Sequence, residues 1–143
     1  MEELNIEILY SSPSKRERLI FGTKDQAALL PYGKYWRLGA NAPTTISINK
    51  DVQFAGKELK SGVYCMYAVP NKDYWDITLN SKINSSGYRP PDPSFDVFTV
   101  AVPVNSTSNL AEQFSISLKE SDLGASMTLK WDHLVTVIPI EIQ

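Results

Sequence analysis

Apolar and polar residues alternate with a period of two along most of the chain, starting at Leu4. A strand with one buried face and one wet face produces this alternation, because successive side chains point to opposite sides of a sheet. The pattern predicts half-buried strands at residues 4–10, 45–54, 75–80, 113–118 and 127–132, and a strand-like tail at 134–142.

Two further segments, residues 63–69 and 97–104, are apolar at both parities. Strands that are covered on both faces have this composition, so we expect both segments to be central strands.

Turn residues separate these runs at Gly56, at 70–73 and at Leu123-Gly124. The only helical pattern is about one turn at residues 25–30, which Pro31 ends. Short strands without a long helix predict an all-β fold, a two-sheet antiparallel β-sandwich of which the jelly roll is one form. No repeat or linker divides the chain, so a single β-sandwich domain is expected over residues 1–143.

Composition narrows the classes of function. The net charge of −2 comes without a basic block, which argues against a nucleic-acid partner. No run approaches the roughly 20 apolar residues of a membrane span. The amino terminus has neither a basic start nor an apolar run, so no signal peptide is expected. Nothing in the sequence indicates the oligomeric state.

Catalytic and metal signatures are weak. His133 is the only histidine and Cys65 the only cysteine. They are far apart in sequence and form no zinc-ligand pattern, so no cofactor or metal is expected. The flanking residues are apolar, which favours a buried, unreactive role for the Cys65 thiol.

Two other matches have simpler explanations. Ser12 and Lys15 fit the S-x-x-K pattern of serine acyl enzymes, but Pro13 intervenes in a β context and no companion K-T-G is present. Asp92 and Asp96 could bind calcium, although aspartates in such a loop more often shape a turn.

The best candidate site lies in two long loops, residues 22–43 and 81–95. Their aromatic faces, guanidinium groups and amide suit a saccharide or a carboxylate-bearing ligand. The alternative is that Trp36 plugs one end of the sandwich while Arg37 pairs with a buried carboxylate. The candidate ligand-binding residues are Tyr32, Trp36, Arg37, Asn41, Tyr88 and Arg89.

The segment Pro31 to Asn41 resembles the P-Y-G-x-x-W-R-x-G-A-N signature of a bacterial family, domain of unknown function 2911 (DUF2911). Other stretches resemble the same family in the same order, so the likeness covers nearly the whole chain. They are Tyr10–Pro13, Lys50–Val52, Gly56–Tyr64, Val69-Pro70 with Trp75–Ile77, Asp96-Val97 and Leu129–Trp131.

The resemblance implies an exported protein of the Bacteroidota or their relatives, periplasmic or extracellular, with no established activity. One position departs from the family pattern. Ala42 stands where relatives commonly have Glu, so any acid–base role of that carboxylate is absent here.

Three classes of function remain open. The first is a non-catalytic module of the bacterial cell envelope that binds a small polar ligand, a saccharide or peptide. The second is a hydrolase-like enzyme with a carboxylate and Arg site, which requires a pocket with convergent titratable groups. The third is a structural or assembly module, which requires an apolar patch or an unpaired strand edge.

Overall fold

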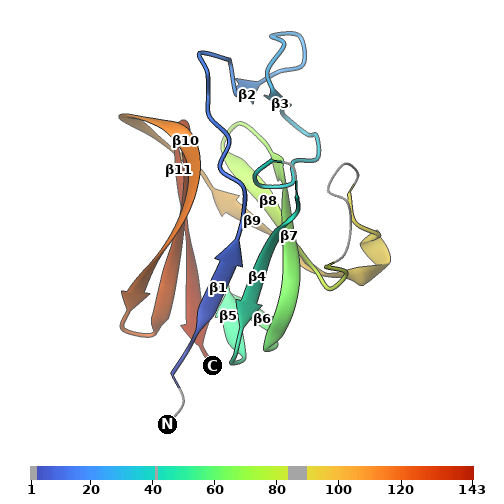
Figure 1. Ribbon diagram of the computed structural model, residues 1–143, viewed down its shortest axis with the longest axis vertical. Coiled ribbons are helices and arrows are strands. Elements are labelled where there is room, and N and C mark those ends of the chain that lie inside the picture. The colour runs from blue at the N-terminus through green and yellow to red at the C-terminus, as the bar shows by residue number, and fades with distance from the viewer. Residues whose placement is uncertain (1–2, 41, 84–89) are drawn as a thin grey trace.

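The computed structural model describes residues 3–40, 42–83 and 90–143, which form two antiparallel sheets (Figure 1). The five-stranded sheet has the order β1-β4-β7-β8-β9 and the four-stranded sheet β10-β11-β5-β6. The strands are β1 (Ile6–Leu9), β2 (Phe21–Gly22), β3 (Leu30–Pro31), β4 (Thr44–Ile48), β5 (Val52–Phe54), β6 (Lys57–Leu59), β7 (Gly62–Pro70), β8 (Tyr74–Asn80), β9 (Asp96–Pro103), β10 (Asn105–Ser121) and β11 (Gly124–Ile142).

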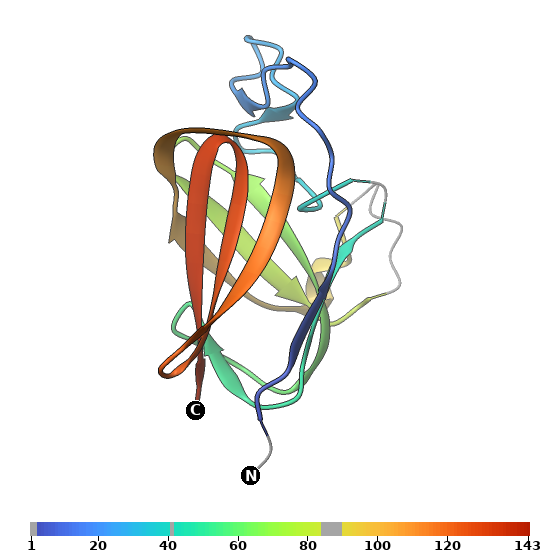
Figure 2. The ribbon, with the colours of Figure 1, turned by 60° about the vertical axis from the view of Figure 1, so that its left-hand side comes forward.

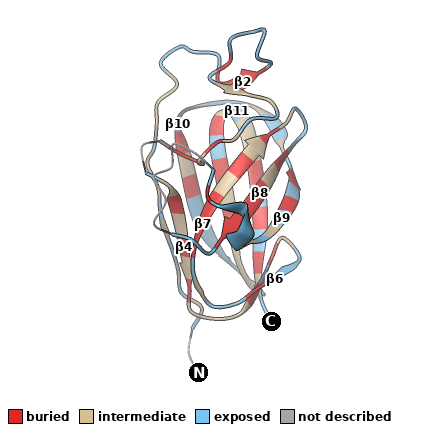
Figure 3. Cartoon of the chain, turned by 90° about the vertical axis from the view of Figure 1, so that its right-hand side faces the viewer, coloured by how far each residue is buried: buried red, intermediate tan, exposed pale blue. Residues whose placement is uncertain are grey.

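The inner faces of the two sheets share one hydrophobic core, which confirms the predicted all-β sandwich. Alternate residues of each strand contribute to it, so buried and exposed bands alternate along the ribbon in Figure 3. The described residues contain one short helix, the 3-10 turn η1 (Pro93–Phe95). None of the described helices is long and apolar enough to span a membrane.

Consecutive strands β7, β8 and β9 form a meander, and the predicted turn at 70–73 joins the first two. The chain passes between the sheets from β4 to β5, from β6 to β7 and from β9 to β10. The predicted turn at Gly56 joins β5 to β6. Ala55 and Gly56 have φ of 49° and 85°, and a two-residue turn with two positive φ values matches the twist of a hairpin.

Strand β11 bends back on itself, so its two halves lie side by side in Figure 2. The Ile142 amide donates to the Leu123 carbonyl at 2.8 Å, which places the end of the strand beside its beginning. The bend contains Asp132, whose φ is 58°. Before it the buried positions are odd (Met127, Leu129, Trp131), and after it they are even (Thr136, Ile138, Ile140).

The expectation for residues 97–104 is wrong. Strand β9 is an edge strand of the five-stranded sheet, with one wet face on which Val97 is 44% exposed. Its apolar composition made it similar to β7, but sheet position depends on pairing between distant segments. The prediction that residues 63–69 form a central strand is correct, since β7 is the middle strand of the five-stranded sheet. Its outer face is not covered along the whole strand, because Val63 on that face is 46% exposed.

Residues 10–40 leave the sandwich at one end and return, with β2 and β3 forming a small parallel pair beyond it (Figures 1 and 2). The expected helical turn at 25–30 is wrong. Residues 24–27 form hydrogen-bonded turns, Ala27 has φ of 58°, and Leu30 already belongs to β3. The first described residues, before β1, and the carboxyl terminus lie at the opposite end of the sandwich.

Candidate functional site

Trp36 is placed by a backbone bridge to the middle strand of the large sheet. The Trp36 amide donates to the Ala68 carbonyl at 2.7 Å, and the Ala68 amide returns a bond of 2.8 Å. Directly opposed residues in such a pair share a face, so Trp36 joins Ala68 on the core side. Tyr35 and Arg37 consequently point to the outer side, where the register sets Arg37 opposite Tyr67.

The core end beneath this bridge is an aromatic cluster. The Trp36 ring centroid lies 5.3 Å from Trp75, 5.1 Å from Phe114, 5.8 Å from Phe21 and 6.1 Å from Trp131. Trp36 is only 3% exposed, and its indole N–H donates to the Gly39 carbonyl at 3.3 Å. Trp36 therefore seals this end of the sandwich, as the end-plug alternative expected for that residue.

A pocket of about 430 Å³ opens over this sealed end. Trp36 and Trp131, which are 3% and 1% exposed, are among its lining residues, and Leu29 and Leu30 come from the segment that leaves the sandwich. The charged and hydroxyl-bearing residues of the lining are Arg18, Tyr35 and Arg37. The remaining lining residues are Pro13, Gly39 and Ala40.

Tyr35 and Arg37 are both half-buried. Burial raises the pKa of the Tyr35 hydroxyl above its usual 10.0, the Cys65 thiol adds to the rise, and the positive charge of Arg37 opposes it. The phenol therefore remains protonated at neutral pH and can donate a hydrogen bond. The Tyr35 ring also packs against Tyr67, with 5.5 Å between centroids.

A carboxylate network continues from Tyr67 across the outer face of the sheet. The Tyr67 hydroxyl donates to both oxygens of Asp96, at 2.9 and 3.0 Å, and the Asn80 amide donates at 2.8 Å. Burial, followed by Asp96, raises the pKa of Tyr67 to about 12 and that of Cys65 to about 11. The Asp96 contacts hold the start of β9 against β7 and β8.

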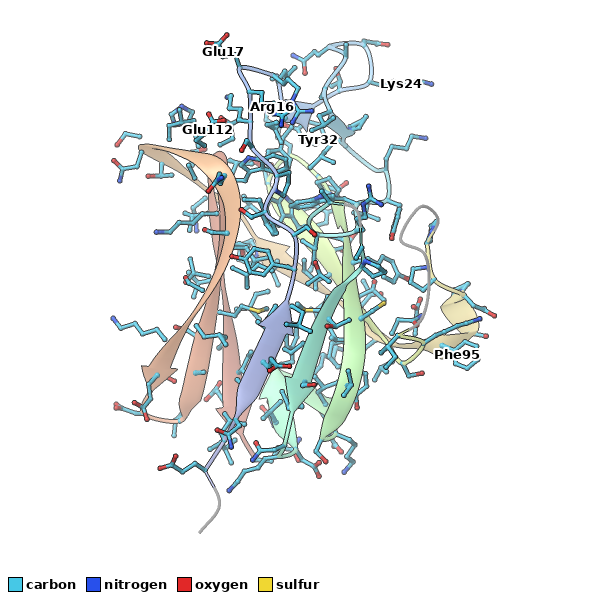
Figure 4. The ribbon with its side chains drawn as sticks, viewed as in Figure 1. Arg16, Glu17, Lys24, Tyr32, Phe95 and Glu112 are labelled. Carbon is cyan, nitrogen blue, oxygen red and sulfur yellow. The ribbon has the colours of Figure 1, made fainter. Side chains whose placement is uncertain are left out.

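The structure brings two of the six predicted residues, Trp36 and Arg37, into the pocket lining. Tyr32 is not among the described lining residues. It is half-buried against the core, its amide donates to the Gly22 carbonyl at 2.8 Å, and Figure 4 shows it below Arg16 at the end of the sandwich. The other three predicted residues, Asn41, Tyr88 and Arg89, lie outside the described residues.

Sequence reasoning missed Arg18 and Tyr35. Tyr35 lies inside the predicted segment, and its parity relative to Trp36 would have placed it beside Arg37. No sequence motif that suggests a site includes Arg18. The available signal was the apolar pair Ile20-Phe21, which is buried in the structure and draws the preceding residues towards the core.

The other sequence matches have structural partners. The Ser12 hydroxyl donates to the Phe114 carbonyl at 2.5 Å, whereas Lys15 forms an ion pair with Asp132 at 2.5 Å. Asp92 caps η1 by accepting bonds from the Ser94 amide and hydroxyl, a turn-shaping role. Exposed His133 contacts the Thr107 carbonyl at 3.2 Å. Within residues 3–40, 42–83 and 90–143, no three His, Cys, Asp or Glu side chains form a group that could hold a metal.

Comparison with known proteins gives one family match. A family model described as a protein of unknown function (DUF2911) matches residues 1–140 of the 143-residue chain. No curated protein and no solved structure matches the chain.

Proposed function

Because the chain belongs to the DUF2911 family, whose description assigns no activity, we propose its function from the pocket: it binds a small polar ligand, a saccharide or peptide, without transforming it. The observation that carries this proposal is the pocket of about 430 Å³, whose lining residues combine apolar Leu29, Leu30, Trp36 and Trp131 with Arg18, Tyr35 and Arg37. Small-molecule sites commonly combine apolar walls with a few placed polar groups. We place this binding module in the bacterial cell envelope, following the sequence resemblance.

The chemistry of the lining supports binding rather than hydrolysis. Among its described residues there is no carboxylate, imidazole or thiol to act as a general base. The carboxylate of Asp96 already accepts bonds from Tyr67 and Asn80 and does not belong to this lining. The family's usual Glu is replaced by Ala42, which removes another candidate for acid–base chemistry.

Thermal denaturation with a panel of neutral and acidic saccharides and dipeptides tests the proposal. A ligand present at about 100 times its Kd stabilises the native state by about 2.7 kcal/mol, which is readily measured as a rise in Tm. Arg37→Gln should remove the rise, while Lys34→Gln, an exposed charge on the same segment outside the described lining, should keep it. No stabilisation by any compound, or equal stabilisation of Arg37→Gln, would contradict the proposal.

An open seam between the sheets favours a second candidate, an assembly module. Strand β10 and the chain before β2 are joined at the Ser14–Gln113 bridge. Below it, no backbone hydrogen bond joins β1 to β10 in the described residues. Unpaired strand edges can accept a further strand, and a groove of about 760 Å³ with Ile6 and Leu118 in its lining runs along them.

The assembly candidate predicts that a second copy of the chain adds a strand at this groove. The mean mass of the protein in solution should then rise with its concentration, and the Leu118→Lys variant should remain a monomer. A wild-type protein that stays monomeric at all concentrations would exclude this mode of assembly.

A further inference from the structure

The segment that projects beyond the end of the sandwich differs in charge from the rest of the chain. Residues 16–34, the projecting tip, contain the β2–β3 pair and lie at one end of the longest axis of the molecule (Figure 1). The remaining residues carry a net charge of −4, whereas the tip carries +2, within the formal −2 of the whole chain. The charged residues of the tip, all of them exposed, are Arg16, Glu17, Arg18, Lys24, Asp25 and Lys34.

The four basic side chains of the tip are not neutralised by ion pairs. None of them pairs with a carboxylate within residues 3–40, 42–83 and 90–143. Glu112 lies at the base of the tip, where it accepts a hydrogen bond of 2.9 Å from the backbone amide of Arg16, and Figure 4 shows both residues there. Lys24 extends away from the sandwich in the same view. Exposed charges of this kind attract an anionic surface within a Debye length, about 10 Å at 0.1 M salt.

Arg18 is ordered but keeps its charge. Its Nε donates to the Lys15 carbonyl at 2.9 Å and its Nη2 to the Ser14 carbonyl at 2.7 Å. These bonds hold the guanidinium across the turn at Arg16 and Glu17, whose φ values are 53° and 59°. Backbone carbonyls are neutral, so the positive charge remains available to an anion at the surface.

Exposed apolar side chains accompany these charges. Leu19 is 45% exposed and Leu29 is 42% exposed. The Leu29 amide donates to the Leu19 carbonyl at 2.9 Å, so the two leucines lie on neighbouring backbone segments of the tip. Apolar side chains beside basic ones suit the surface of an anionic bilayer, where the apolar groups enter the boundary with the acyl chains and Lys or Arg attracts the headgroups.

The tip is anchored, so these leucines cannot turn inward without displacing core residues. Ile20 and Phe21, which follow Leu19, are 0% and 7% exposed and belong to the hydrophobic core. The Phe21 ring centroid lies 5.3 Å from that of Trp75. Burial of Ile20 and Phe21 therefore fixes the segment on which Leu19 is exposed.

We propose that the projecting tip docks the protein on an anionic membrane surface. Its basic side chains contact the lipid headgroups, and Leu19 and Leu29 enter the boundary with the acyl chains. A bilayer fits better than a nucleic acid, because four basic residues beside two acidic ones neutralise few phosphates and because phosphate contacts leave the leucines in water. This inference goes beyond the proposed ligand-binding function and does not depend on it.

Co-sedimentation with lipid vesicles tests the proposal. Phosphatidylcholine vesicles with about 30% phosphatidylglycerol should bind the protein about tenfold or more tightly than phosphatidylcholine alone, and added salt should reduce this preference. Each basic residue at an anionic surface adds about fivefold in affinity, so Arg16→Gln with Lys24→Gln should weaken binding about 20-fold. The matched control, Lys57→Gln with Lys119→Gln, removes the same charge from exposed positions outside the tip and should bind within about threefold of the wild type.

Glu17 provides a test of opposite sign. It lies at the outer end of the tip in Figure 4, so Glu17→Gln should strengthen binding to the anionic vesicles by up to about fivefold. A damaged fold would not produce such a gain. Leu19→Asn with Leu29→Asn should weaken binding about tenfold or more at both low and high salt, because it removes apolar surface and no charge. Circular dichroism verifies that each variant is folded.

Several results would overturn membrane docking. One is equal binding to the neutral and anionic vesicles, or binding to neither. Another is an unchanged affinity of the double leucine variant, together with equally tight binding of the wild type to an oligonucleotide, which would show that the tip attracts any polyanion. Self-association that Arg16→Gln with Lys24→Gln abolishes, without vesicle binding, would assign the tip to a second copy of the chain instead.

Discussion

Trp36 and Ala68 exchange two backbone hydrogen bonds, at 2.7 and 2.8 Å, between a loop and the middle strand of the five-stranded sheet. This bridge fixes the parity of the loop. It sends the Trp36 ring into the core and leaves Tyr35 and Arg37 on the outer side, both in the lining of the pocket. A residue that seals the core and residues that can contact a ligand therefore alternate along one short segment.

Trp36→Ala should lower the free energy of unfolding by about 3–5 kcal/mol, because it leaves a large cavity among Phe21, Trp75 and Trp131. Urea denaturation measures the change. Tyr74→Ala is a suitable control, since Tyr74 is 44% exposed and its loss should cost about 0.5 kcal/mol or less. A Trp36→Ala variant as stable as this control would show that the indole does not support the core.

The bend of β11 depends on a positive φ at Asp132 and on its ion pair with Lys15. Asp132→Asn removes the charge but tolerates this conformation, and because the two side chains are only 21% and 16% exposed, loss of the ion pair should cost about 1–3 kcal/mol. Asp132→Ala also strains the backbone and should cost about 1 kcal/mol more than Asp132→Asn. Equal free energies of unfolding for the two variants, measured by urea denaturation, would mean that the positive φ at position 132 does not affect stability.

The Cys65 thiol should react slowly in the native protein. It is 1% exposed, and burial raises its pKa from 9.0 to about 11. A rise of this size lowers the thiolate fraction at pH 8 about 100-fold, before any steric protection is counted. Labelling with a thiol reagent should therefore be at least about 100-fold slower than in urea. Comparable rates in both states would contradict burial of this side chain.

Alkaline pH should destabilise the fold by ionising Cys65 and Tyr67 on the outer face of the five-stranded sheet. Folding raises the pKa of Cys65 to about 11 and that of Tyr67 from 10.0 to about 12, so both neutral forms are favoured in the native state. Their stabilising effect is complete below the unfolded pKa values and is lost as pH rises from about 9 to about 12. Tyr67→Phe should flatten the upper part of this decline, while Tyr74→Phe should not; identical profiles would contradict the assignment.

The strands of the sandwich could be predicted because their alternation is local, as at β1 and β8. The reversal of parity at Asp132 could not, since an aspartate at a bend carries the same polarity as one on a wet strand face. The segment at 97–104 was placed centrally because its composition suggests burial, whereas its edge position arises from which strands pair. A short window of sequence does not show which distant strands pair with each other.

The candidate site was predictable only in part. Aromatic and guanidinium groups at Trp36 and Arg37 indicated the segment, and the structure places both in the pocket lining. The chain before β2 supplies Arg18, and Phe21, three residues further on, anchors that segment against Trp36 with 5.8 Å between ring centroids. This contact joins two loops across the sandwich end, so a pattern read along the chain does not reveal it.

The most direct test of ligand binding in this pocket is an NMR titration of the isotope-labelled chain with glucuronate and with alanyl-alanine. The predicted result is a saturable set of amide shifts concentrated at Leu29, Leu30 and residues 35–40, and lost in Arg37→Gln. Saturable shifts elsewhere, for example along the seam at residues 118–122, would contradict the assignment of the site. The absence of any saturable shift would contradict binding of either probe.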